Sequence, residues 1–116
     1  MYAYEIPNLR FSMPAGGAVL RNHFVAIASE KAITANASAA VIGASMNEVT
    51  EKDFAAGERI VEIADGIVMV VAAGAITSGA AVYSNASGEA IATGDKAVGV
   101  AITSATGAGQ LVAVKL

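Results

Sequence analysis

The stretch Thr93–Ile102, TGDKAVGVAI, joins a turn signal to an alternating apolar run. Its Gly-Asp pair favours a tight turn. In the run that follows, Val98, Val100 and Ile102 fall on one face, and this period of two predicts a β-strand. We expect that face to lie in the core, so that an Ile102→Ala change would cost roughly 2–5 kcal/mol.

Short apolar runs separated by turn signals recur along the chain from residue 23 onward, which favours many short strands. Asp65-Gly66 is a strong turn signal and predicts a hairpin between two of these runs. Thr50 and Asp53 are spaced to cap one helical turn. The predicted strands are His23–Ala28, Ala32–Ala35, Ala40–Ser45, Glu58–Ile63, Ile67–Ala72, Ala80–Ser84, Glu89–Thr93, Ala97–Ser104 and Gln110–Leu116.

An internal repeat runs through these predicted strands. Its matching segments are 25–27 with 82–84, 31–33 with 89–91, 41–43 with 97–99, and 60–63 with 111–114. The loop in the first copy is longer. Two short β units that cannot each bury a face are expected to pack on one another as a barrel or sandwich. We expect Gly43 and Gly99 to mark equivalent sites where the backbone of a neighbouring strand comes close.

Composition narrows the function. The 116 residues fit one domain, and the net charge of −3 without a basic run argues against nucleic-acid binding. The chain has no cysteine, which excludes disulfides and thiolate zinc sites. Its longest apolar stretch, Ile67–Ile76, is far shorter than the roughly 20 residues that span a bilayer, so we expect no membrane partner. The first residues show no signal-peptide pattern.

Residues 1–22 contain both prolines and half of the aromatic residues. A segment broken by proline is poorly suited to forming its own core, whereas aromatic side chains supply large contact areas. We interpret residues 1–22 as an extended arm and residues 23–116 as the β-domain. The alternative is a tail that folds back onto its own barrel. The expected contact residues of the arm are Tyr2, Tyr4, Ile6, Pro7, Phe11 and Pro14.

No residue pattern predicts catalysis. His23 is the single histidine, and a metal site would need further His, Cys or clustered carboxylate ligands. The acidic residues between positions 48 and 65 lack the spacing of a calcium loop. The serines lie in no nucleophile-elbow pattern. We therefore expect no catalytic, cofactor-binding or metal site, and we interpret the acidic stretch as a solvated loop or a charged contact patch.

Lys96 offers an alternative function. Lipoyl carrier domains present their modified lysine on a tight β-turn, often in an Asp-Lys-Ala triplet, and Asp95-Lys96-Ala97 spells that triplet. The following strand has no polar recognition surface, and no Ala-Pro linker is present. A solvent-facing turn residue is the simpler interpretation. A carrier or ligand-binding β-module, including a sugar-binding one, stays as the alternative, although aromatic residues outside the arm are few.

The order of several segments resembles the capsid-cement, or head-decoration, proteins of tailed bacteriophages. The segments that carry the resemblance are MYAYEIPNLRFSMPAGGAV, HFVAIA, AVIGA, GAITSGAAVYSNASGEAIA and AVGVAITSATGAGQLVAVKL. The resemblance implies an all-β fold, a small β-barrel or β-tulip-like domain without a catalytic site or cofactor.

The resemblance also implies a structural role in the virion. Such proteins bind the outside of the capsid, commonly as homotrimers around threefold or quasi-threefold positions, and bridge neighbouring major capsid subunits. The expected location is the outer capsid surface, with host cytoplasm during assembly. A β-domain of the phage tail or baseplate is a further alternative that the sequence leaves open.

Overall fold

The computed structural model describes residues 6–57 and 59–116, and the side chains of these residues from Leu9 onward. The described chain confirms the expected all-β class, with one short helix, α1 (Glu51–Ala55). The strands are β1 (Ile6–Pro14), β2 (Phe24–Ala28), β3 (Lys31–Thr34), β4 (Gly43–Ser45), β5 (Ile60–Val71), β6 (Ala81–Ser84), β7 (Ala90–Ile91), β8 (Ala97–Ala101) and β9 (Leu111–Lys115).

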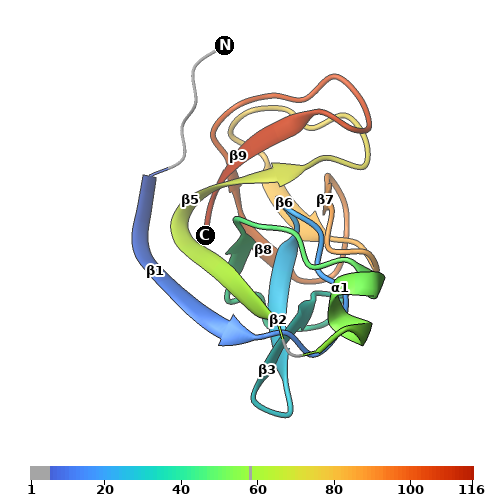
Figure 1. Ribbon diagram of the computed structural model, residues 1–116. Coiled ribbons are helices and arrows are strands. Elements are labelled where there is room, and N and C mark those ends of the chain that lie inside the picture. Colours follow the sequence, from blue (N-terminus) through green and yellow to red (C-terminus); the bar gives the residue numbers. More distant parts are fainter. Residues whose placement is uncertain (1–5, 58) are drawn as a thin grey trace.

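All nine strands join one antiparallel sheet in the order β3-β2-β4-β5-β9-β8-β6-β7, and β1 pairs with β5 outside this path. The sheet curls on itself, and the long bent β5 crosses its middle (Figure 1). The β2–β3 hairpin turns at Ser29 and Glu30, both with positive φ, as two-residue hairpin turns often require. The fold is therefore a small, barrel-like β-domain.

The hairpin predicted across Asp65-Gly66 is wrong, because β5 runs through both residues without turning. Gly66 adopts φ 114°, and its amide donates a hydrogen bond of 2.8 Å to Asp65 Oδ1. β1 pairs with the first part of β5 and β9 with the last part. Pairing with β1 and β9 on the two sides of Gly66 thus overrides the local preference for a turn. Gly66 instead lies at a bend within the strand.

The internal repeat is confirmed by the strand register. Val25 of β2 lies opposite Gly43 of β4, and at the matching place Val82 of β6 lies opposite Gly99 of β8. The next pairing also matches: β4 pairs antiparallel with β5 in repeat 1, and β8 pairs antiparallel with β9 at the equivalent place. We call residues 6–65 repeat 1 and residues 66–116 repeat 2.

Two backbone hydrogen bonds extend the repeat to the N-terminal strand. Ala15 N donates to Arg59 O over 2.7 Å, and Ala72 N donates to Gln110 O over 2.8 Å. These bonds close equivalent corners of the two repeats. They make β1 the counterpart of the second half of β5, just as the first half of β5 is the counterpart of β9. One strand therefore ends repeat 1 and begins repeat 2.

This equivalence corrects the expected separation of residues 1–22 from the domain. Residues 6–14 form a strand of the domain's own sheet, from Ile6 opposite Ile67 to Pro14 opposite Ile60. Val19, further along the expected arm, is fully buried. Over the described residues, the segment folds back onto its own domain, as in the alternative. Residues 1–5 lie outside the described part of the chain.

The predicted facing of β8 is right for Val98, which packs against the buried core, and wrong for Val100 and Ile102. Ala101 is buried, whereas Val100 and Ile102 are 45% and 39% exposed. The register between β6 and β8 shifts between Val82 and Tyr83, so that one residue of β8 is extra. Because such a bulge reverses the inward and outward positions beyond it, the period of two predicted the strand but not its face.

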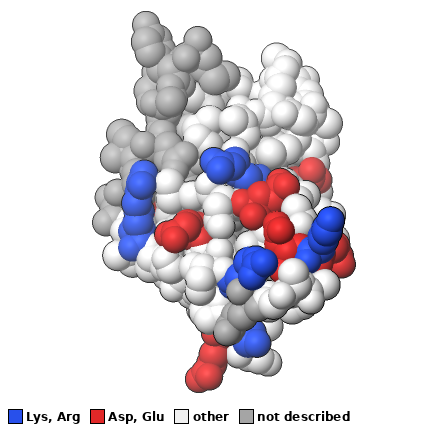
Figure 2. Space-filling model, in the orientation of Figure 1, with Lys and Arg blue, Asp and Glu red and all other residues white. Residues whose placement is uncertain are grey.

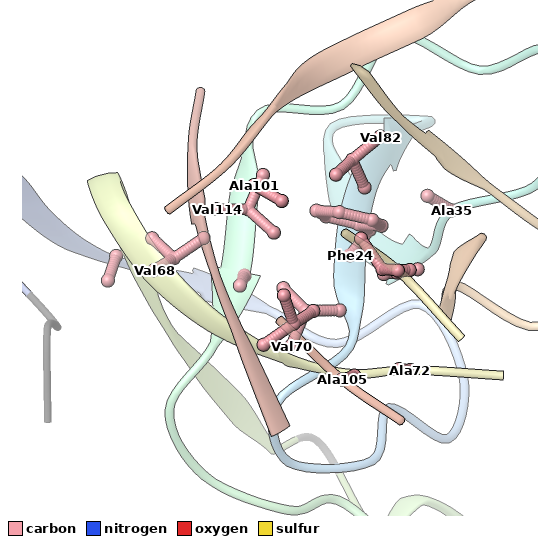
Figure 3. Packing of buried hydrophobic residues seen from close by; sticks show 14 of the residues in the cluster. Phe24, Ala35, Val68, Val70, Ala72, Val82, Ala101, Ala105 and Val114 are labelled. Atoms are coloured by element: carbon pink, nitrogen blue, oxygen red, sulfur yellow. The ribbon is translucent and has the colours of Figure 1, made fainter. Parts of the chain in front are cut away.

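The buried side chains form two clusters, one for each repeat. Core 1 contains Ala15, Val19, Val25, Ala32, Val49, Val61 and Ile63. Core 2 contains the corresponding residues of repeat 2, among them Val70, Val82 and Val114, together with residues of repeat 1. Phe24, on the opposite face of β2 from Val25, reaches into core 2 (Figure 3). The face of repeat 1 that carries Phe24, which we call its outer face, thus packs against repeat 2. This contact holds the two units together.

Candidate interaction surfaces

The expected contact residues of the N-terminal segment divide into three groups. Tyr2 and Tyr4 lie outside the described residues. Ile6 and Pro7 belong to β1, where their backbones pair with Ile67 and Gly66. The remaining two, Phe11 and Pro14, are half-buried.

Phe11 packs against core 1 together with Met13. Its partner across the strands, Ile63, is fully buried. The side chain of Phe11 is therefore partly engaged by its own domain, and only its open side is available to another molecule. Sequence reasoning placed Phe11 on a detached arm because it could not see the pairing of β1 with β5.

Charged side chains are concentrated in repeat 1. After residue 65, the only charged residues are Glu89, Asp95, Lys96 and Lys115. Figure 2 shows the result on one face, where blue and red atoms cluster across the middle and lower parts and the upper right lobe is white. Repeat 2 therefore has a surface with few charges, made mostly of small residues such as Ala, Gly, Ser and Thr, with Val100, Ile102 and Leu111 as its exposed large apolar side chains.

The insertion that lengthens the loop of repeat 1 contains α1, whose capping is as predicted. Thr50 Oγ1 accepts from Asp53 N over 3.0 Å, and Thr50 N donates to Asp53 Oδ2 over 3.1 Å. The hydrogen bond from the backbone of Thr50 is the main cause that lowers the pKa of the Asp53 carboxyl. The acidic loop is thus an ordered element that positions its charges.

An open pocket of about 590 Å³ lies beside this loop. Its lining is mostly apolar and comes from the loop and both repeats: Ala18, Leu20, His23, Thr34, Thr50, Glu51, Lys52 and Ser87. His23 is almost fully buried there. Its Nδ1 donates to Arg21 O over 2.9 Å, and its Nε2 lies 3.9 Å from Glu89 Oε2.

The contact of His23 with Glu89 joins the two repeats, because Glu89 follows a turn whose Gly88 carbonyl accepts from Phe24 N over 2.7 Å. Sequence reasoning favoured a surface or core position for His23 over a ligand role, but it did not predict this contact with Glu89. The sequence repeat could have pointed to an interface between the units, but not to the residues that form it.

Lys96 is exposed in the connection between β7 and β8. Both of these strands pair with β6, so the connection crosses the end of β6 and is not the turn of a hairpin. A Cβ on Gly94 in this connection would lie 2.9 Å from the Tyr83 ring. The connection is thus packed against the sheet, unlike the projecting hairpin expected of a lipoyl carrier.

Two further features bear on function. The described residues contain no group of three or more His, Cys, Asp or Glu side chains placed to hold a metal ion. Within the same part of the chain, no helix has the length and apolar character needed to cross a membrane.

The structure defines a small, barrel-like β-domain, and comparisons with known proteins give its family. Residues 5–116 match the phage cement protein family, so the chain belongs to the phage cement proteins. Members of this family are capsid-associated structural proteins of bacteriophages, which confirms the resemblance in the sequence. A search of curated proteins gives no match.

A similar fold is found in the crystal structure of the head fiber gp8.5 N base of bacteriophage phi29. The two chains share 19% sequence identity, and the TM-score is 0.74. The alignment covers 93% of this chain and 94% of the other. At this identity the likeness supports the fold, and it confirms the small barrel-like β-domain that the sequence predicts.

Proposed function

We propose that the protein binds the outer surface of an assembled phage capsid and stabilises it by bridging neighbouring major capsid subunits. The observation that carries this proposal is the match of nearly the whole chain to the phage cement proteins. The proposed assembly is a homotrimer at threefold or quasi-threefold positions. The protein would reside in the host cytoplasm during assembly and on the virion afterwards, and it would act without catalysis.

One feature of the structure supports a binding role. Repeat 2 carries few charges and exposes apolar side chains, so that its contact with another protein costs little desolvation. The proposed contacts of the N-terminal segment are Tyr2, Tyr4, Ile6, Pro7, Phe11 and Pro14, with Tyr2 and Tyr4 as its main anchors. Binding only to the assembled shell would stabilise that shell by mass action.

The test uses undecorated shells of the phage that encodes the protein. Purified protein is added to the shells, bound protein is measured by co-sedimentation, and shell disruption is followed on heating. We expect saturable binding and a higher disruption temperature. Imaging of the decorated shells should place the added density on the outside, between major capsid subunits. Absence of binding to intact, correctly expanded shells would contradict the proposal.

A double variant, Tyr2→Ala with Tyr4→Ala, tests the N-terminal contact. Interface aromatics often contribute more than about 1 kcal/mol each, so affinity for shells should fall on the order of tenfold or more. The matched control is Tyr83→Phe, which keeps the ring against Gly94 and removes a hydroxyl far along the chain. Equal affinities of the double variant and the parent would remove these residues from the contact.

A further inference from the structure

The outer face of repeat 1 is buried in a way that the outer face of repeat 2 is not. Neighbouring residues of three paired strands form one row on the outer face of repeat 1: Phe24, Ala44 and Ala64. All three are at most 2% exposed, because they pack against core 2. This row of repeat 1 thus covers core 2.

Repeat 2 contains the equivalent row without a cover. Its members, by the same strand pairings, are Ala81, Val100 and Lys115. Val100 is 45% exposed, and Ile102, two residues further along, is 39% exposed. We call Ala81, Val100, Ile102 and Lys115 the outer face of repeat 2. It is the exposed counterpart of a face that repeat 1 buries, with Val100 and Ile102 as its apolar residues and Lys115 at its edge.

The strand that borders core 1 is more exposed than the equivalent strand that borders core 2. Leu9, Phe11 and Met13 alternate along β1, and their counterparts in β5 are Gly66, Val68 and Val70. The three β5 residues are buried, whereas Leu9 is 55% exposed and the other two β1 residues are half-buried. We call Leu9, Phe11 and Met13 the open side of repeat 1.

We propose that two copies of this chain associate head to tail, with the outer face of repeat 2 of one copy docked on the open side of repeat 1 of the next. The contact between the repeats within one chain is the model for this arrangement. There the outer face of repeat 1 packs on core 2, and we expect the outer face of repeat 2 to pack in the same way beside core 1 of another copy. Both unmatched surfaces are apolar at their centres. This inference specifies the self-contact of the proposed homotrimer, but it does not depend on binding to a capsid.

A contact of this kind is heterologous, since two different surfaces of the chain meet. Heterologous contacts either close into a ring or continue as a filament. Because the two surfaces differ, a variant in one surface leaves the other surface of the same chain intact. The experiments below therefore change each surface separately and then mix the two variants.

The first experiment measures self-association of purified full-length protein by sedimentation velocity and native mass spectrometry. Val100→Glu places a carboxylate on the outer face of repeat 2, and Leu9→Lys places an ammonium on the open side of repeat 1. Each should weaken association on the order of tenfold or more, because a charge must be desolvated at the contact. Ile102→Glu repeats the test on the outer face at a residue outside the strands.

The matched control is Ile27→Glu, at a residue that is 52% exposed on the β2–β3 hairpin and belongs to neither surface. It should associate like the parent. Thermal melting of every variant confirms that it is folded. A fall in association for Ile27→Glu equal to that for Val100→Glu would show a general effect of charge and overturn the assignment.

The decisive experiment mixes Leu9→Lys with Val100→Glu. Each variant keeps the surface that the other has lost, so one intact contact can form between them. We expect heterodimers in the mixture, although neither variant alone forms higher species. A contact of the outer face with itself would instead yield no heterodimer, which would overturn the head-to-tail arrangement.

Two other results would also overturn the proposal. If the parent protein stays monomeric at hundreds of micromolar, the proposed contact between copies does not form. If Val100→Glu then loses shell binding, the outer face of repeat 2 contacts the capsid rather than another copy. Conversely, a parent protein that self-associates but does not bind intact shells would contradict the proposed function and leave the head-to-tail contact in place.

Discussion

Two glycines show how closely the repeats match at the scale of single residues. A Cβ added to Gly43 would overlap the carbonyl oxygen of Ala64 and approach Ile63 Cγ2 to 2.7 Å. A Cβ added to Gly99 would overlap the carbonyl oxygen of Lys115 and approach Val114 Cγ1 to 2.9 Å. The sequence prediction that both glycines allow close backbone approach is confirmed.

We expect Gly43→Ala and Gly99→Ala each to lower the free energy of unfolding by about 1–3 kcal/mol, because backbone atoms must shift to admit the methyl group. Urea unfolding of the purified variants provides the measurement. Gly17→Ala and Gly74→Ala are matched controls at another equivalent pair, where a Cβ meets nothing within 4 Å. Controls as unstable as the test variants would refute the steric explanation.

Single residues were harder to assign to a face than to a strand. Val98, Val100 and Ile102 alternate with small residues, and this pattern located β8 correctly. Their facing depends on the bulge against β6, which is fixed by the partner strand and leaves no local signature. The expected 2–5 kcal/mol loss for Ile102→Ala is therefore withdrawn, since Ile102 is substantially exposed.

At the scale of elements, β1 and β5 decide the architecture. β5 carries a partner on each side, with β4 and β9 along one edge and β1 along the other. β1 covers the inner edge of core 1 through Phe11 and Met13. The N-terminal strand is therefore part of the folded unit, and removing it has a different consequence from removing the residues before it.

Deletion of residues 1–14 should destabilise the domain, because it removes all strand pairing of β1 with β5 and uncovers Val61 and Ile63. Deletion of residues 1–5 should leave the melting temperature nearly unchanged. Thermal unfolding followed by circular dichroism distinguishes the two. If the shorter deletion also loses shell binding, the contact lies in residues 1–5. A 1–14 deletion as stable as the parent would mean that β1 is dispensable.

The capping box of α1 gives a prediction for pH. The pKa of Asp53 is lowered from its usual 3.8, so its native contribution is complete above that value and is lost as pH falls through the lower native pKa. We expect the NMR titration of the Asp53 carboxyl to show a midpoint below 3.8. In Thr50→Ala the midpoint should move only part of the way back toward 3.8, because the variant loses the Thr50 hydroxyl but keeps the backbone N–H that is the main cause of the lowered pKa. A midpoint that is unchanged in Thr50→Ala would contradict the contribution of the Thr50 hydroxyl.

Elements with strong local signals were predicted well. The Thr50 cap and the strand after the Ser29-Glu30 turn are specified by nearby residues. The Asp-Gly pair in β5 has an equally strong local signal, yet it lies inside a strand because both edges of β5 find partners. The pairing of β1 with β5 joins residues that are 46 to 61 positions apart in the sequence, and no local pattern encodes it.

At the scale of the whole molecule, two similar units are joined into one by a few side chains. Phe24 is the largest of the fully buried side chains and crosses from repeat 1 into core 2. His23 approaches Glu89 beside it. The sequence repeat predicted two units that pack on one another, and core 2 confirms this because it contains residues of both repeats. Core 1 belongs to repeat 1 alone, which the sequence did not predict.

Phe24→Ala should therefore cost about 3–5 kcal/mol through lost burial and a residual cavity. Because the side chain joins the units, repeat 1 and repeat 2 should lose cooperativity in the variant. Hydrogen exchange should then give different opening free energies for β2 and β9, whereas we expect similar values for these two strands in the parent. A small change in stability, or an unfolding transition that stays fully cooperative, would refute this role of Phe24.

The three strands at the centre of the sheet also determine how the protein can be extended. Ile67 of β5 lies between Ile6 of β1 and Lys115 of β9, so the two outer backbones are only about 10 Å apart, twice the spacing of paired strands. Cargo fused before Ile6 or after Leu116 would thus leave the domain from one place. A short peptide linker could join these points and allow new ends to be opened in the exposed β2–β3 turn, which makes the fold a candidate for circular permutation and for display of two fused groups side by side.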